Sequence, residues 1–176
     1  MGLQLCRLLL FVLFTTYQGA WAQNAAPGLG AQHDSSQPIE ITADTLDVSQ
    51  TDQTALFSGK VVATQGDMRL GSDNLRVHYR NEEAEAEKAA ISRLDAIGNV
   101  TVSSPTEMAQ GDWGVYDVDS GQITLGGNVV LTRGENVLRG EQLVIDLESG
   151  QSRITSKKDG GGRVKGLFVP SKKQTR

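Results

Sequence analysis

The sequence predicts an all-β protein, an elongated antiparallel β-jelly-roll or β-solenoid, on three observations. Apolar and polar residues alternate from residue 39 onward, and β-branched residues are frequent in the alternating stretches. Turn residues bound these stretches, as in Gln65-Gly66-Asp67 and Arg133-Gly134-Glu135-Asn136. The chain also has 20 glycines and no sustained apolar stripe at helical spacing, which disfavours helix.

A repeat of about 29 residues is the basis for the elongated shape. The hexapeptide Asp117–Gln122 recurs in similar form as Asp146–Gln151. A Gly-[Lys/Asn]-Val motif begins at Gly59, Gly98 and Gly127, and an acidic residue follows each glycine at one constant spacing. A unit of this length, with about three short strands, cannot bury its apolar face alone. We therefore expect consecutive units to stack into a two-sheet structure with an apolar interior.

The first 22 residues have the pattern of a secretory signal peptide. Arg7 precedes an apolar run from Leu8 to Phe14, and Ala20-Trp21-Ala22 supplies a small-x-small cleavage site. A retained anchor helix is the alternative, but this run is much shorter than the roughly 20 apolar residues that a membrane span needs. The single cysteine, Cys6, lies in this segment, so we expect an exported, periplasmic fold without disulfides.

The rest of the chain is predicted to form a leader, one domain and a tail. Residues 23–38 lack periodicity and are expected to be a flexible leader, whereas residues 39–171 form the predicted jelly-roll domain. Within this domain, the Ala/Glu-rich stretch Asn81–Ala90 exceeds the repeat period and has no apolar face, which predicts a solvated excursion. Residues 172–176 are a basic tail.

Alternation within the strands assigns one face of each strand to an apolar interior and the other, with Thr101 and Thr132, to the polar exterior. The simplest interpretation of the apolar positions is an ordinary core. Because aromatic residues are scarce, however, the lining is slim and could leave a groove for an aliphatic ligand. The candidate groove residues are Leu46, Val48, Phe57, Val61, Leu75, Val77, Val100, Val102, Tyr116, Leu125, Val129, Leu131, Leu143 and Ile145.

The sequence shows no constellation typical of catalysis, a metal or a cofactor. The exported part has no cysteine, and its two histidines, His33 and His78, are far apart in the sequence. A second set of residues, the recurring acids, could be imagined as a metal ladder, but each follows a small residue at a bend, where a carboxylate that caps local N–H groups is a sufficient explanation. These acids are Asp44, Asp73, Asp112 and Glu141. We therefore predict that this protein is not an enzyme and binds no metal or cofactor.

The charge distribution argues against a nucleic-acid partner. The whole chain has a net charge of −4, although residues 156–176 carry a strong excess of Lys and Arg, so the body of the protein is acidic. Binding to a phosphate backbone depends on clustered basic residues, which this body lacks.

Both ends of the predicted sheet are open to a partner. Residues 39–48 form the first strand, and residues 163–169 form the last strand before Pro170. Unpaired edge strands invite pairing with another chain, and these two strands differ in sequence, which favours head-to-tail association of copies of this chain. The candidate docking residues are Ile39, Ile41, Val164, Leu167, Phe168 and Val169.

Four stretches together resemble the LptA/OstA-like family of lipopolysaccharide transport proteins, over roughly residues 39–171. They are Ile41-Thr42-Ala43-Asp44-x-Leu46-x-Val48, Ala96-Ile97-Gly98-Asn99-Val100-x-Val102, Leu125-x-Gly127-Asn128-Val129 and Arg163-Val164-x-x-Leu167-Phe168-Val169-Pro170-Ser171. The resemblance implies a non-enzymatic V-shaped jelly-roll whose interior accepts the acyl chains of lipopolysaccharide. It also implies head-to-tail docking with itself and with related folds in the inner-membrane and outer-membrane transport components.

Two alternatives to this carrier remain open from the sequence. One is a structural or adhesin-like exported β-solenoid without a lipid ligand, which lipid co-purification would distinguish. The other is an inner-membrane-anchored protein of the same fold, which retention of the first 22 residues would distinguish.

Overall fold

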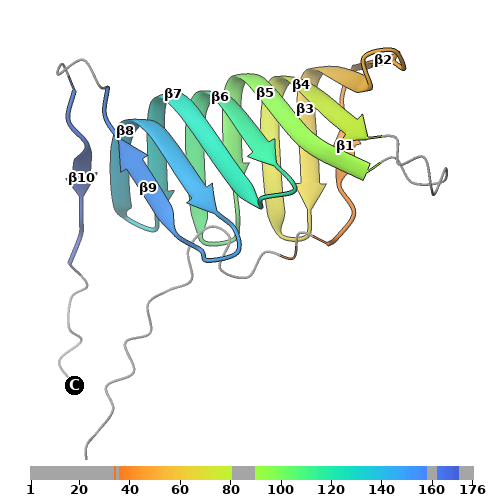
Figure 1. The fold of residues 1–176 in the computed structure, drawn as a ribbon. Coiled ribbons are helices and arrows are strands. Elements are labelled where there is room, and N and C mark those ends of the chain that lie inside the picture. Colours follow the sequence, from red (N-terminus) through yellow and green to blue (C-terminus); the bar gives the residue numbers. More distant parts are fainter. Residues whose placement is uncertain (1–33, 35, 81–89, 158–161, 171–176) are drawn as a thin grey trace, which may run out of the picture.

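Figure 1 shows the computed structural model, which describes residues 34, 36–80, 90–157 and 162–170. These residues form ten β-strands and no helix, so the all-β prediction is confirmed. The strands are β1 (Glu40–Thr42), β2 (Thr45–Ser49), β3 (Thr54–Gln65), β4 (Met68–Arg80), β5 (Ala90–Ser103), β6 (Glu107–Asp117), β7 (Gln122–Arg133), β8 (Asn136–Asp146), β9 (Ser152–Thr155) and β10 (Lys165–Leu167). Within the described ranges, no helix has the length and hydrophobicity to cross a membrane.

Several predicted segments fall wholly or mostly outside the described residues. They are the signal peptide at 1–22, most of the leader at 23–38, most of the Ala/Glu-rich stretch and the tail at 172–176. Ala90, which we predicted to be the end of the solvated excursion, instead begins β5 and pairs with Arg80.

All ten strands belong to one antiparallel sheet, so the prediction of two sheets was wrong. β3 to β8 are hydrogen-bonded to their neighbours in chain order, and each of them has between 11 and 14 residues. The edges are shared by pairs of short strands: β1 and β2 both pair with β3, and β9 and β10 both pair with β8. The predicted short strands on either side of each Gly-[Lys/Asn]-Val motif are therefore halves of one long strand.

A β-bulge at each of these motifs keeps the long strand continuous but bends it. The register shifts between Ser58 and Val61 in β3, and at the corresponding motif in β5 and in β7. Both residues of each bulge have positive φ, for example 75° at Gly127 and 49° at Asn128. Glycine and asparagine tolerate this region of backbone space better than other residues, which explains the Gly-Asn pairs of β5 and β7. Lys60, with a φ of 47°, occupies the same position in β3.

The line of bulges divides the sheet into two walls, which lie as two layers in Figure 1. Wall A contains β2, residues 54–58, 74–80, 90–97, 113–117, 122–126 and 142–146, and β9. Wall B contains β1, residues 61–65, 68–72, 100–103, 107–111, 129–133 and 136–140, and β10. The hydrophobic core lies between the walls.

Three of the four recurring acids lie against the bulges, and Glu141 does not. The carboxylate of Asp112 lies against Gly127, so that a Cβ added there would be 2.4 Å from Asp112 Oδ2. Asn128 Nδ2 donates a hydrogen bond of 3.0 Å to the same oxygen. Asp73 has the same relation to Gly98 and Asn99, and Asp44 lies against Gly59. The partners of Asp73 and Asp112 thus include side-chain amides across the strands, whereas the sequence had predicted the capping of local N–H groups.

The two copies of the repeated hexapeptide form equivalent turns at the tips of wall A. Ser120 N donates to Asp117 Oδ1 at 2.9 Å, and Ser149 N donates to Asp146 Oδ1 at 2.8 Å. These backbone hydrogen bonds stabilise the ionised carboxylates and so lower the pKa of both aspartates. Leu147 N donates to Gly121 O at 2.9 Å, which joins the two turns. The 29-residue period itself stays a prediction.

Candidate functional site

The interior between the two walls is the candidate ligand site, and most of the predicted groove residues lie there. They form a closely packed core, in which side chains of wall A face side chains of wall B. The buried members are Val61, Leu75, Val77, Val100, Val102, Tyr116, Leu125, Val129, Leu131, Leu143 and Ile145. In this structure these residues therefore form an ordinary hydrophobic core. Their contact with a ligand stays a prediction.

One glycine lets the walls approach each other closely. A Cβ added to Gly114, on the inner face of wall A, would lie 3.1 Å from Val100 Cγ1 of wall B and 2.7 Å from Leu125 Cδ2. These side chains thus occupy the space that a larger residue would fill at position 114. The small residue explains why no open groove separates the walls at this point.

The remaining predicted groove residues lie at the β1/β2 end of the molecule. Leu46 pairs with Phe57 and Val48 pairs with Ala55, so alternation placed Leu46 and Val48 on the correct face. Phe57 is partly buried against the core, but Leu46 and Val48 are 52% and 60% exposed. β2 is an edge strand of wall A, and an edge position leaves an apolar residue uncovered even on the inner face.

The N-terminal docking residues are partly buried. Ile39 and Ile41 pack against the core, and Ile41 is in register with Ala63. The predicted continuous first strand is wrong, because the chain leaves β1 before β2 begins. At this break Asp44 N donates to Gly59 O at 3.0 Å, next to the first bulge.

The C-terminal docking residues Val164, Leu167, Phe168 and Val169 are all exposed. The strand in this segment is shorter than predicted, because β10 comprises only Lys165–Leu167, in register with residues 137–139 of β8. Val169 N donates to Asn136 Oδ1 at 3.0 Å, which attaches the segment beyond β10 to wall B. Within the described ranges, neither the β1/β2 edge nor the β9/β10 edge pairs with a further strand.

A buried hydrogen bond connects the tips of the two walls. The Tyr116 hydroxyl of wall A donates to Gln65 Oε1 of wall B at 3.1 Å, and Gln65 Nε2 donates to the carbonyl of Gln37 at 2.9 Å. Both side chains are nearly inaccessible, with 2% and 3% exposure for Tyr116 and Gln65. Burial raises the pKa of Tyr116, so its phenol keeps the proton that it donates.

A small cavity of about 10 Å³ adjoins this hydrogen bond. Its volume is roughly the minimum that can hold one water molecule. Its apolar lining includes Ile39, Met68, Leu70, Leu94, Val102 and Ile123. Gln65 was missed as a site residue in the sequence, although it follows Val61 and Ala63 in the inward alternation. That alternation is the signal that could have identified it.

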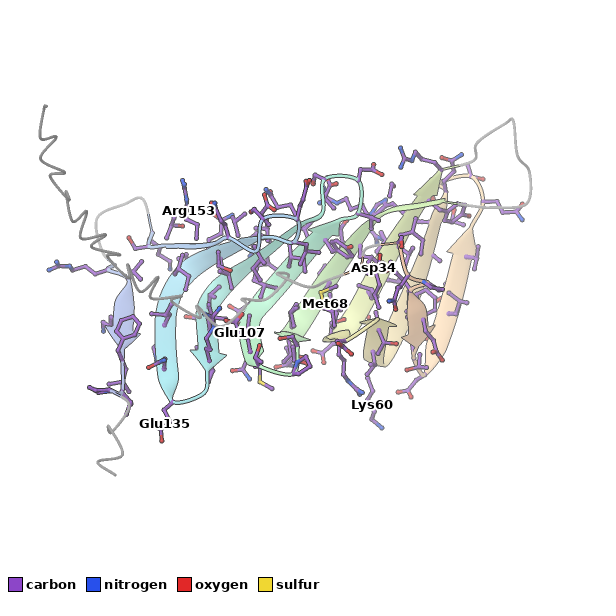
Figure 2. The ribbon with its side chains drawn as sticks, turned by 90° about the horizontal axis from the view of Figure 1, so that it is seen from below. Asp34, Lys60, Met68, Glu107, Glu135 and Arg153 are labelled. Carbon is purple, nitrogen blue, oxygen red and sulfur yellow. The ribbon has the colours of Figure 1, made fainter. Side chains whose placement is uncertain are left out.

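Two further polar features lie near the walls. Glu107 is buried at the tip of wall B and forms an ion pair with Arg133. Figure 2 shows Met68 and Glu107 within the body of the molecule, whereas Lys60 and Glu135 project from its rim. On wall A, His78 Nε2 contacts Asp95 Oδ2 at 2.8 Å, so this histidine has a carboxylate partner. No group of three or more His, Cys, Asp or Glu in the described part of the chain is placed to hold a metal ion.

Residues 40–151 match the family model described as "LptA/(LptD N-terminal domain) LPS transport protein". A protein of Rhizobium meliloti (strain 1021) without an assigned function is 31% identical over 149 residues, covering 83% of this chain and 78% of that protein. The lipopolysaccharide export system protein LptA of Escherichia coli (strain K12) is 23% identical over 155 residues, covering 84% of this chain and 80% of its own.

A solved structure has the same fold. It is LptH of Pseudomonas aeruginosa, described as the LptA-homologous periplasmic component of the lipopolysaccharide transport device. The two structures align with a TM-score of 0.66 and 18% identity over 78% of this chain and 99% of LptH. The resemblance inferred from the sequence motifs is confirmed, and the chain belongs to the LptA/(LptD N-terminal domain) family of LPS transport proteins.

Proposed function

We propose that this protein is a periplasmic, non-enzymatic carrier of lipopolysaccharide that holds the acyl chains between walls A and B. The observation that carries this proposal is a core of aliphatic side chains between two walls that are joined along the line of bulges. The family membership supports lipopolysaccharide as the ligand, and the periplasmic location of LptH supports the compartment.

The arrangement of hydrogen bonds allows the walls to separate. Ladder hydrogen bonds run between neighbouring strands within each wall, so moving the wall tips apart leaves them intact and exchanges core packing for contacts with a ligand. Burial of an acyl chain contributes about 0.8 kcal/mol per CH₂, or on the order of 10 kcal/mol for a dozen carbons, before the lost wall contacts are subtracted. The acidic body would repel phosphate, so we propose that the headgroup stays in water.

Photo-crosslinking tests the proposed interior site. A photoreactive amino acid at Leu131, on the inner face of wall B, is expected to label lipopolysaccharide on irradiation of the purified protein. Thr132 is the matched control, because it is the next residue along β7 and lies on the outer face. Equal labelling from both positions would contradict an interior site. Absence of labelling from either would favour a structural β-solenoid without a lipid ligand.

We further propose that the protein bridges the membranes by head-to-tail pairing of the β9/β10 edge with the β1/β2 edge of the next copy. The same edges would dock the related folds of the inner-membrane and outer-membrane components. Edge pairing supplies backbone hydrogen bonds to groups that the isolated sheet leaves unpaired. The exposed side chains of Leu167 and Phe168 beside one edge, and of Leu46 and Val48 beside the other, would supply the apolar contact.

Truncation after Gly162 tests this docking. It removes β10, whose register with β8 involves only three residues and whose three residues are all exposed, so we expect the domain to remain folded. The truncated protein should bind lipopolysaccharide but lose concentration-dependent oligomers in sedimentation velocity. Equal association of the truncated and full-length proteins would contradict the role of residues 163–169.

A further inference from the structure

The hydrogen bond between Tyr116 and Gln65 lies where an acyl chain would have to part the walls. Tyr116 belongs to wall A and Gln65 to wall B, and both line the cavity beside the bond. The other lining side chains, such as Met68, Leu94 and Ile123, are mostly apolar. A lipid that enters here therefore meets one specific polar pair in a hydrocarbon environment.

Parting the walls separates the phenol from the amide oxygen. A buried donor or acceptor that loses its partner is strongly unfavourable, so the bound lipid is favoured if it replaces the lost hydrogen bond. The orientation of the Gln65 amide is fixed, because its Nε2 donates to the Gln37 carbonyl and its Oε1 therefore faces Tyr116. The separated pair offers one donor, the Tyr116 O–H, and one acceptor, the Gln65 Oε1.

A hydroxyl group complements both members of the pair. Its oxygen accepts from the Tyr116 O–H while its own hydrogen is donated to Gln65 Oε1, so it inserts into the bond as a water molecule would. A carbonyl oxygen can accept from Tyr116 but supplies no donor for Gln65. A plain hydrocarbon segment satisfies neither group. The pair thus discriminates among lipids by the functional group that the acyl chain carries where it passes between Tyr116 and Gln65.

We propose that Gln65 and Tyr116 form a polar clasp that selects lipids with a hydroxyl group on the acyl chain over lipids with an unsubstituted chain. This inference rests on the proposed function, since it names the specificity determinant of the same interior site. In the lipid-free protein, the hydrogen bond between Gln65 and Tyr116 holds the two walls together. A hydroxylated acyl chain is accepted by exchanging that bond for two others.

Matched fatty acids test the clasp. Isothermal titration calorimetry compares the affinities of the purified protein for 3-hydroxytetradecanoate and tetradecanoate. Both fatty acids are used below their critical micelle concentrations. Because a net hydrogen bond contributes about 1 kcal/mol, the hydroxylated chain is expected to bind roughly fivefold to tenfold more tightly. Tyr116→Phe keeps the ring and removes the hydroxyl, so the lipid hydroxyl can then only donate to Gln65 Oε1, and this ratio should fall to roughly twofold to threefold.

Two further variants make the result specific. Gln65→Leu removes the acceptor from the other wall and should lower the preference to a similar extent, which covers the case in which Tyr116→Phe does not fold. Tyr79→Phe is the matched control, because the Tyr79 hydroxyl lies in the same wall and donates to the Ser49 carbonyl, outside the cavity lining. Its preference should equal that of the unmodified protein.

The outcomes separate the clasp from the carrier function. If the unmodified protein binds both fatty acids equally, or if Tyr116→Phe and Gln65→Leu both keep the full preference, the clasp is wrong and the interior lipid site stands. If the unmodified protein binds neither fatty acid, both the interior lipid site and the clasp are wrong.

Discussion

Replacement of Val100 by aspartate is expected to abolish cooperative folding. Val100 is 1% exposed in the middle of the core, where its Cγ1 would lie 3.1 Å from a Cβ added to Gly114 on the opposite wall. The substitution removes this packing and buries a carboxylate without a partner. The resulting loss in the free energy of unfolding should exceed about 4 kcal/mol, which approaches the whole stability of a typical domain. Urea titration followed by circular dichroism measures the effect.

The control for this substitution is Gln110→Asp. Gln110 is exposed on the outer face of wall B, close to Val100 in the sheet because its neighbour Gly111 pairs with Val100. A surface substitution of this kind should change the free energy of unfolding by no more than about 0.5 kcal/mol. A normal unfolding midpoint for Val100→Asp would mean that the walls do not enclose a dry core.

Replacement of Gly127 by alanine is expected to destabilise the protein by about 2–4 kcal/mol, through backbone strain and a steric clash. The φ angle of 75° is unfavourable for any side chain, and the new Cβ would lie 2.4 Å from Asp112 Oδ2 and 2.8 Å from Asp112 Cβ. The backbone strain and the clash can be measured separately, because Gly134 in the β7–β8 turn has a φ of 56° but nothing within 4 Å of its added Cβ.

Thermal or urea unfolding of both alanine variants provides the comparison. Gly134→Ala should report the strain alone, about 1–2 kcal/mol, and the larger loss in Gly127→Ala should report the contact with Asp112. Asp112→Ala in the Gly127→Ala background should restore part of that loss, since the double-mutant cycle isolates the pairwise term. Equal losses in the two glycine variants would show that the aspartate does not support the bulge.

The sequence was most informative where burial and alternation coincide. Leu75, Val102 and Leu125 were assigned to the inner face from a period of two, and all three are completely buried. Alternation reports the face but not its coverage, which is why Leu46 and Val48 are inward-facing yet exposed. Coverage depends on whether a neighbouring strand or an opposite wall is present, and neither is encoded in the local pattern.

Strand length and the polar clasp required the structure. The Gly-Asn pairs resemble strand boundaries in sequence, but two consecutive residues with positive φ produce a bulge, after which the same strand continues. Two predicted sheets therefore became one. Gln65 had the correct inward parity, but its partner Tyr116 lies 51 residues away, and a contact at that separation leaves no local signal.

The chain-order pairing of β3 to β8 also affects how this protein can change in size. Each long strand pairs with its immediate chain neighbours, so a hairpin can be added or removed without rerouting a connection. With strands spaced about 4.8 Å apart, one hairpin changes the length of the molecule by roughly 10 Å. The same nearest-neighbour order lets the sheet be extended by successive addition of hairpins. The length of the molecule can therefore change in evolution by steps of two strands, while its cross-section is preserved.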